Sequence, residues 1–375
     1  MALAACLAGC SSGRTVRLSV VDPGHFHASL VQKYSLPDVD PTVRVYAPAG
    51  PELEQYLAAI EGYNSRSEAP CNWKEVIVEG SPLETLPEAS GREAVILAGN
   101  NRNKAAYILH AVSKGYNVLS DKPMAISAAD IDILEQAYAL AREKGLVIQE
   151  LMTERTVAGN IALREWFSSH PIEPGSPGAP AVRIRSVHHF YKEVDGKPLT
   201  RPEWYYDIRC QGEGIADVTT HYIDMVMTEC FPGQAISQED VSVVSARHWT
   251  TPITREQFRL STGAGDFPSY LEPWIEDGVL NVYANGSMIL CIKGVSVGIE
   301  VIWDFEGTDS FEAEYSGFEG TLPKDSLSHE DHFSLVLKDF LAYIRGEKAF
   351  PEHEAGNTLT KYRLIGRAVQ MANGE

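Results

Sequence analysis

Short apolar runs alternate with helical patterns along the first 150 residues of the chain. The clearest unit covers residues 94–126, where an apolar run at 94–98 has the length of a buried parallel strand. Apolar residues then recur at helical spacing over 105–112, and a second apolar run follows at 116–120. The pattern predicts strand, helix, strand. Asp121-Lys122-Pro123 follows the second strand, at the edge where open α/β sheets bind ligands.

The same alternation continues on both sides of this unit. Helical patterns occupy residues 25–34 and 51–63, and Ser127 and Asp130 have the spacing of a capping box that opens another helix. Further strands are predicted at residues 15–21, 42–47, 75–79 and 146–150. Repeated strand and helix units predict a doubly wound α/β domain over residues 15–150.

The second half of the chain has a different pattern. A helix is predicted at residues 157–169, and the Pro/Gly-rich segment 171–180 is expected to be a surface linker. Few helices separate the strands predicted after it, and two helices are predicted near the C-terminus, at 333–344 and 358–371. The strands are predicted at 181–194, 241–249, 279–284, 287–293 and 296–303. Residues 151–375 are therefore expected to form an α+β domain with a mostly antiparallel sheet and C-terminal helices.

Composition and charge indicate a globular protein and argue against nucleic-acid binding. The 375 residues suit two domains, and 44% hydrophobic with 22% charged residues is ordinary for a globular protein. The formal net charge is -19, and no cluster of Lys or Arg offsets it locally. Such a chain repels phosphate backbones, so we expect no nucleic-acid partner.

The six cysteines are scattered, without metal-binding or disulfide spacing. At the N-terminus, a short apolar run ends in Leu7-Ala8-Gly9-Cys10, which resembles a bacterial lipoprotein signal in which Cys10 becomes lipidated. Residues 1–14 are then signal and linker, and the protein faces the periplasm from a lipid anchor. The run lacks a basic segment before it, so a wrongly assigned start and a cytoplasmic protein is the alternative.

The turn after the first strand departs from the dinucleotide-binding pattern GxGxxG. Asp22, Gly24 and His27 stand at its three glycine positions, so only the middle glycine remains. The second strand ends at Ala47, where an acidic residue would bind the adenine ribose. Glu52 is the nearest carboxylate that could substitute, although an acid there also suits a first helical turn.

Two groups of residues could carry acid–base chemistry. Lys122, at the end of a strand, could lower the pKa of an alcohol, or it could be a solvated turn lysine. In the segment 212–224, a glycine-rich turn opens a helix on which Asp217 and His221 are four residues apart and share a face. Asp224 could accept an imidazole N–H from His221 and fix its tautomer.

These two segments together resemble the glucose-fructose oxidoreductase / inositol dehydrogenase / MocA (Gfo/Idh/MocA) family. Lys122 falls on the lysine of the family's Glu-Lys-Pro motif, with Asp121 replacing the glutamate. Asp217, His221 and Asp224 fall on its DxGxHxxD stretch. The resemblance implies an N-terminal Rossmann domain and a C-terminal open-faced sheet that carries substrate residues.

The resemblance also implies NAD(P)-dependent oxidation or reduction of a sugar, polyol or glycoside. The resemblance does not decide between NAD and NADP, and we slightly favour NAD. In that scheme His221 is the general acid/base, Lys122 assists it and orients the nicotinamide, and Asp217 binds neighbouring hydroxyls. Arg155 and Tyr206 are expected to line the substrate cleft, or to be core or interface residues. The expected cofactor residues are Gly24, His25, Phe26, Gly99, Asn100, Asn101, Asp121, Lys122 and Pro123.

Several alternatives remain open at this stage. Some relatives use a recycled NAD to cleave glycosidic bonds, and a chain with a damaged fingerprint could be a carbohydrate-binding lipoprotein without activity. His25, His27, His188, His189 and His221 also permit a metal site, but nothing in the sequence forces these segments together, and we expect no metal. The family implies a homo-oligomer formed through the open sheets.

Overall fold

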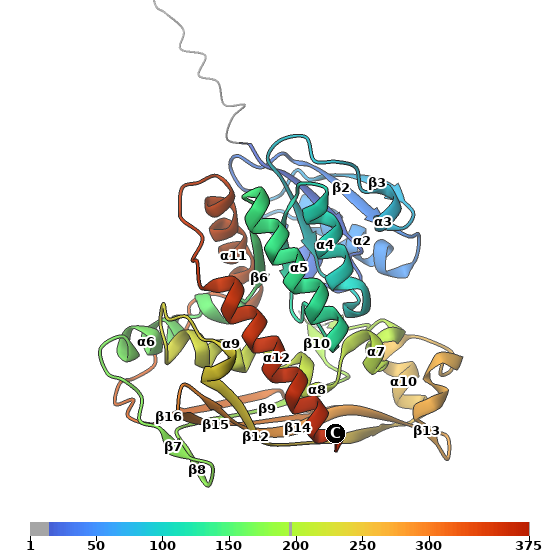
Figure 1. Ribbon diagram of the computed structural model, residues 1–375. Coiled ribbons are helices and arrows are strands. Elements are labelled where there is room, and N and C mark those ends of the chain that lie inside the picture. Colours follow the sequence, from blue (N-terminus) through green and yellow to red (C-terminus); the bar gives the residue numbers. More distant parts are fainter. Residues whose placement is uncertain (1–14, 195–196, 375) are drawn as a thin grey trace, which may run out of the picture.

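The computed structural model describes residues 15–194 and 197–374. Two domains lie one above the other, and the predicted lipidation site at Cys10 lies outside the described residues (Figure 1). Among the described helices, none combines the length and the apolar character that crossing a bilayer requires.

The N-terminal domain is built on a six-stranded parallel sheet of order β3-β2-β1-β4-β5-β6. This is the Rossmann order, and it confirms the predicted fold class. The carboxyl ends of β1, β4 and β5 meet at the switch point of the sheet, where ligands bind in such folds. The strands are β1 (Arg17–Val21), β2 (Thr42–Ala47), β3 (Lys74–Glu79), β4 (Glu93–Leu97), β5 (Asn117–Asp121) and β6 (Ile148–Leu151).

The predicted start and end of the helix after β5 are confirmed. Ser127 and Asp130 form the predicted capping box, and Gly145 ends the helix in the left-handed conformation with φ 66°. The first helix is shorter than predicted. It covers one turn, because the amides of Gln32 and Lys33 bond to carbonyls three residues back rather than four. The helices are α1 (His27–Leu30), α2 (Pro51–Ser65), α3 (Pro82–Thr85), α4 (Lys104–Ser113) and α5 (Ala128–Lys144).

The C-terminal domain holds a sheet of order β12-β14-β15-β9-β16, antiparallel except between β15 and β9. The two strands predicted at 279–284 and 287–293 are one strand. Asn285 stays inside it because its side chain bonds to Thr251 and to the amide of Trp303. The strand β16 was not predicted. The strands are β9 (Val182–His189), β12 (Val241–Ile253), β14 (Val279–Ile292), β15 (Val295–Asp304) and β16 (Ser310–Tyr315).

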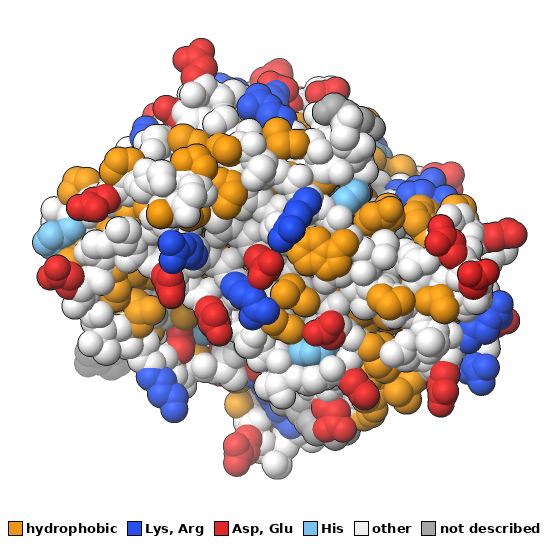
Figure 2. Space-filling view, turned by 90° about the horizontal axis from the view of Figure 1, so that it is seen from below, with side chains coloured by type: hydrophobic (Ala, Val, Ile, Leu, Met, Phe, Trp, Pro, Cys, Tyr) orange, Lys and Arg blue, Asp and Glu red, His pale blue; other side chains and the backbone are white. Residues whose placement is uncertain are grey.

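Helices cover one face of this sheet (Figure 1). The other face is open, and Figure 2 shows charged side chains of both signs scattered among apolar ones on it. The helices of the domain are α6 (Ala158–Phe167), α7 (Ile208–Gln211), α8 (Gly214–Asp217), α9 (Thr219–Glu229), α10 (Arg255–Thr262) and α12 (Glu354–Ala372). One C-terminal helix, α11 (His329–Ile344), instead buries Phe333, Val336 and Phe340 in the core of the Rossmann domain.

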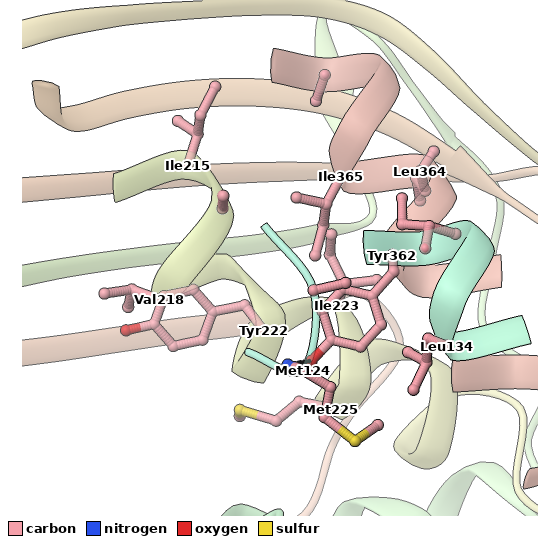
Figure 3. Packing of buried hydrophobic residues seen from close by; sticks show 14 of the residues in the cluster. Met124, Leu134, Ile215, Val218, Tyr222, Ile223, Met225, Tyr362, Leu364 and Ile365 are labelled. Atoms are coloured by element: carbon pink, nitrogen blue, oxygen red, sulfur yellow. Dashed lines mark hydrogen bonds between the residues drawn. The ribbon is translucent and has the colours of Figure 1, made fainter. Parts of the chain in front are cut away.

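A continuous apolar core joins the two domains. In Figure 3 Met124 and Leu134 of the first domain pack near Ile223 and Tyr362 of the second. The Tyr362 hydroxyl also accepts the backbone N–H of Met124 at 2.7 Å. Because Met124 lies two residues after Lys122, α12 fixes the segment that carries this lysine.

Gly214, at the start of α8, provides a test of how closely this helix packs on β14. A Cβ at this position would lie 1.7 Å from the carbonyl oxygen of Ala284. We expect Gly214→Ala to lower the free energy of unfolding by about 1–3 kcal/mol or more through overpacking, measured by urea denaturation. Gly62→Ala is the matched control, because a Cβ added at this position on α2 would have no atom within 4 Å. It should raise stability by about 0.5–1 kcal/mol, and equal effects of the two changes would contradict this packing.

Candidate functional site

A cavity of about 530 Å³ lies between the two domains and brings most of the predicted site residues together. Lys122 reaches it from the end of β5, and His221 reaches it from the first turn of α9. The chemistry-bearing segments of the two halves of the chain therefore share one crevice. The predicted residues that line it are His25, Phe26, Gly99, Asn101, Asp121, Lys122, Asp217 and His221.

An ion pair connects the two domains inside this cavity. The Lys122 Nζ atom lies 2.6 Å from Asp217 Oδ1, and both side chains are largely buried. The amide of Gln211 donates to the other carboxylate oxygen, Oδ2, at 2.8 Å. Both oxygens of Asp217 therefore have protein partners, and its position suits the orientation of Lys122 better than the binding of substrate hydroxyls.

His221 is a neutral imidazole in this environment. Burial holds its pKa well below the usual value, and the nearby Lys122 charge lowers the pKa further. The Nδ1 atom is buried without a hydrogen-bond partner, which leaves Nε2 as the ring nitrogen that can meet a ligand in the cavity. The lowered pKa makes this ring a weaker base than a solvated imidazole, but as a neutral ring it keeps a lone pair that can accept a proton from a bound hydroxyl.

Asp224 does not bond to His221, and the predicted tautomer-fixing contact is wrong. Its two carboxylate oxygens accept hydrogen bonds from Arg155 Nε and Nη2, each at 2.7 Å, and Oδ1 also lies 2.9 Å from Lys361 Nζ. These two cations compensate the charge of the buried Asp224 carboxylate, because a buried carboxylate requires close positive partners.

Two of the four expected substrate residues, Asp217 and His221, line the main cavity, whereas Arg155 and Tyr206 do not. Arg155 pairs with Asp224 and, at 2.6 Å, with Glu354, and it faces a separate cavity of about 310 Å³. Tyr206 is a core residue, stacked on Phe190 with its hydroxyl bonded to Ser261. Tyr205, the residue before it, takes the place in the cavity that was expected for Tyr206.

Trp303 and Arg201 line the cavity, and nothing in the sequence singles them out. Trp303 lies near the carboxyl end of β15 and stacks on His188, with ring centroids 5.0 Å apart. Burial lowers the pKa of His188 to about 4, so this ring is also neutral. The guanidinium of Arg201 lies 4.3 Å from the ring centroid of Tyr205. Together these residues form a wall of aromatic and polar groups, of the kind that binds the faces and hydroxyls of small polar ligands.

A smaller cavity of about 160 Å³ lies beside the turn that follows β1. Gly24 and Asn100 line it, together with Asp22, Glu52 and Trp204. Burial, followed by the charge of Glu52, raises the pKa of Asp22 to about 6. The expected cofactor residues are thus divided between two neighbouring cavities, and Pro123 lines neither of them.

One contact accounts for two departures from the family pattern. His27, at the third glycine position of the fingerprint, places its Nδ1 atom 2.9 Å from Asp121 Oδ2. An aspartate is one methylene shorter than the glutamate of the family motif, and this leaves room for the imidazole. Burial alone would raise the pKa of Asp121, but the charge and hydrogen bond of His27 and the charge of Lys104 hold it well below its usual range.

The sheet order and the interdomain cavity define a two-domain protein with a dinucleotide-binding fold. The family described as "Oxidoreductase family, NAD-binding Rossmann fold" matches residues 43–151. The domain described as "Putative oxidoreductase C terminal domain" matches residues 166–327 and 316–373. The chain belongs to the Gfo/Idh/MocA family of NAD(P)-binding oxidoreductases, as its two motifs predicted.

Solved structures agree with this assignment. A putative oxidoreductase from Parabacteroides merdae ATCC 43184 is 34% identical with a TM-score of 0.89, and the match covers 96% of this chain and 98% of that one. A putative myo-inositol dehydrogenase from Sinorhizobium meliloti 1021 is 15% identical with a TM-score of 0.60, over 96% of this chain and 98% of that one. A 3-ketoreductase from Actinomadura kijaniata in complex with NADP shares the fold at 14% identity, TM-score 0.61, over 95% and 98%. No curated protein matches the chain.

The residues of the two cavities fit a dinucleotide at most positions. Gly99 is required by the fold itself, because a Cβ there would lie 2.0 Å from the carbonyl oxygen of Asp22, so only glycine allows the turns after β1 and β4 to meet. Glu52 in the smaller cavity suits the hydroxyls of a ribose, and Lys122 in the larger one suits the nicotinamide end. Asp22 is the exception, because an ionised carboxylate near a diphosphate is repulsive.

Asp22 generates a prediction about cofactor affinity. Its pKa of about 6 means that the carboxyl is protonated below this pH and ionised above it, so NAD⁺ should bind more weakly as the pH rises through 6. The change Asp22→Asn keeps the size and tolerates the positive φ of 48° at this position. We expect it to tighten NAD⁺ binding at pH 8 by about fivefold, or about 1 kcal/mol, measured by isothermal titration calorimetry.

The control for this prediction is the same pair of titrations at pH 5.5. The NAD⁺ affinities of wild type and Asp22→Asn should differ less there, because more of the Asp22 carboxyl is protonated. Equal affinities at pH 8 would show that the carboxylate does not act on the diphosphate.

Proposed function

We propose that the protein is an NAD(P)-dependent oxidoreductase that acts on a hydroxyl or keto group of a sugar, polyol or glycoside. One observation carries the proposal: the Lys122–Asp217 pair and the neutral His221 line the same cavity as an aromatic wall. An imidazole can take the hydroxyl proton during hydride transfer at a carbinol carbon, and an ammonium group can stabilise the developing alkoxide.

The roles of the residues follow from their contacts. The bound dinucleotide supplies the hydride acceptor for oxidation and the donor for reduction. His221 takes the hydroxyl proton on Nε2 during oxidation and returns it during reduction. Lys122 donates a hydrogen bond to the same oxygen and stabilises its developing negative charge. Asp217 and Gln211 position the ammonium group through the contacts described above.

The lining of the cavity supports a carbohydrate as the substrate class. Trp303 and Tyr205 offer apolar faces, while Arg201 and Lys192 offer donors for hydroxyl or carbonyl oxygens. Related folds include one described as a putative myo-inositol dehydrogenase and one described as a 3-ketoreductase. Glu52 and Asp22 favour NAD, because two carboxylates in the smaller cavity would repel a 2′-phosphate.

The proposal predicts the effect of removing either proton-handling group. Lys122→Ala and His221→Ala should each lower kcat by about 100- to 10,000-fold, measured as NADH formation against a panel of sugars and polyols. Thermal unfolding should show both variants folded. The matched control is Lys114→Ala, which removes a surface lysine paired with Glu88 and should retain the wild-type rate. Wild-type turnover in Lys122→Ala or His221→Ala would refute the assigned mechanism.

Two other activities give different outcomes in the same assay. Glycoside cleavage without net NADH would indicate a redox-assisted glycosidase with a recycled cofactor. Binding of carbohydrate without binding of NAD⁺ would indicate a non-catalytic member of the family, and the altered fingerprint at Asp22 and His27 makes this the second candidate.

We propose in addition that Cys10 anchors the protein to a bacterial envelope membrane. The proposal rests on the Leu7-Ala8-Gly9-Cys10 segment. Expression of the full-length gene in a bacterial host should yield a membrane-fraction protein with acyl chains on Cys10, detected by mass spectrometry. Cys10→Ala should release it from the membrane fraction, and unmodified wild-type protein in the soluble fraction would contradict the anchor.

A further inference from the structure

We propose that His25, His27 and Asp121 form a binding site for a first-row divalent transition-metal ion at the edge of the main cavity. The sequence offered these two histidines together with His188, His189 and His221, but it did not point to Asp121. The fold supplies this third ligand, because β5 ends with Asp121 directly opposite the turn that carries both histidines. All three residues line the cavity.

The geometry of the three donor atoms is close to that of a metal site. The Nδ1 atoms of His27 and His25 lie 2.9 Å and 3.7 Å from the same oxygen, Asp121 Oδ2. Metal–ligand bonds of about 2.0–2.1 Å in a tetrahedron separate the donor atoms by about 3.3 Å. The two observed distances lie on either side of this value, and all three atoms lie within 4.8 Å of one another. Shifts of about 0.4 Å would bring each of the two nitrogens to this distance from the carboxylate oxygen.

The donor set selects the kind of ion. Two imidazole nitrogens and one carboxylate oxygen match the three-ligand catalytic zinc sites and the facial triads of non-haem iron. Magnesium and calcium prefer all-oxygen sites, so this cluster does not suit them. Because the three residues border the cavity, the remaining coordination positions face the space where a substrate oxygen or water could bind.

The surroundings limit the affinity but do not prevent binding. Lys104 Nζ lies 3.1 Å from the backbone oxygen of Asp121, and Lys122 is the next residue in the chain, so two ammonium groups oppose a cation. Asp217 neutralises Lys122 through their ion pair. The existing contacts at the cluster are the His27–Asp121 bond and a 3.4 Å contact from the His27 amide to His25 Nδ1. A metal ion would replace the proton shared by His27 and Asp121.

The experiment is a titration of the untagged protein with Co²⁺ alone, after dialysis against a chelator and without any nucleotide. Tetrahedral or five-coordinate Co²⁺ reports its ligands through visible absorption bands, and Zn²⁺ should displace it. We expect one Co²⁺ per chain. His25→Ala should weaken binding by more than the roughly 10- to 100-fold that loss of an outer-shell partner costs. His25 is the best position to change because its ring makes the longer contacts in the cluster.

His329→Ala is the matched control, because His329 lines the same cavity but is not a member of the cluster. It should bind Co²⁺ as the wild type does. Asp121→Asn keeps the size of the side chain and removes its charge, and thermal unfolding checks that it folds. Absence of Co²⁺ binding to the wild type, unchanged binding in His25→Ala, or equal loss in His329→Ala would each overturn the site. The measurement uses no nucleotide or sugar, so its failure leaves the proposed redox activity untouched.

Discussion

A buried ionic cluster around Lys361 holds the two domains in register. Its ammonium group lies 2.5 Å from Glu150, at the end of the Rossmann sheet, and 2.9 Å from Asp224, on the helix that carries His221. Arg155 pairs with the same Asp224 and with Glu354. Burying these charges is favourable only when each one has its partners, so the cluster tolerates a single arrangement of the strand and the helices that contribute to it.

That arrangement determines what the cavity can do. Tyr362, the residue after Lys361, bonds to Glu150 and accepts the amide of Met124, which fixes the chain immediately after Lys122. Asp224 lies one helical turn beyond His221, so the same cluster sets the position of the imidazole. The same network therefore fixes, from outside the cavity, both Lys122 and His221, the two residues to which we assign the proton transfer, although neither belongs to it.

The alternation of strands and helices, the capping box of α5 and the order of the two domains could all be predicted from local patterns, because each depends on residues close together in the chain. The meeting of Lys122 and His221 followed from two motifs considered together. The roles given to Asp224 and Arg155 could not be predicted correctly. Spacing on a helix places Asp224 near His221, but its actual partners, Arg155 and Lys361, are 69 and 137 residues away. The same holds for Asp121 and His27, whose contact spans 94 residues.

The structure explains one of the two altered glycine positions in the dinucleotide-binding turn. His27 and Asp121 replace a glycine and a glutamate as a matched pair, whereas Asp22 introduces a charge that disfavours a diphosphate. The central claim is that the larger cavity holds a nicotinamide ring. A crystal structure of the protein with NAD⁺ tests this claim most directly. The account predicts the nicotinamide ring in the larger cavity, in contact with Lys122 and His221, and the adenosine beside Glu52. An empty larger cavity at saturating NAD⁺, or a nucleotide bound elsewhere, would contradict it.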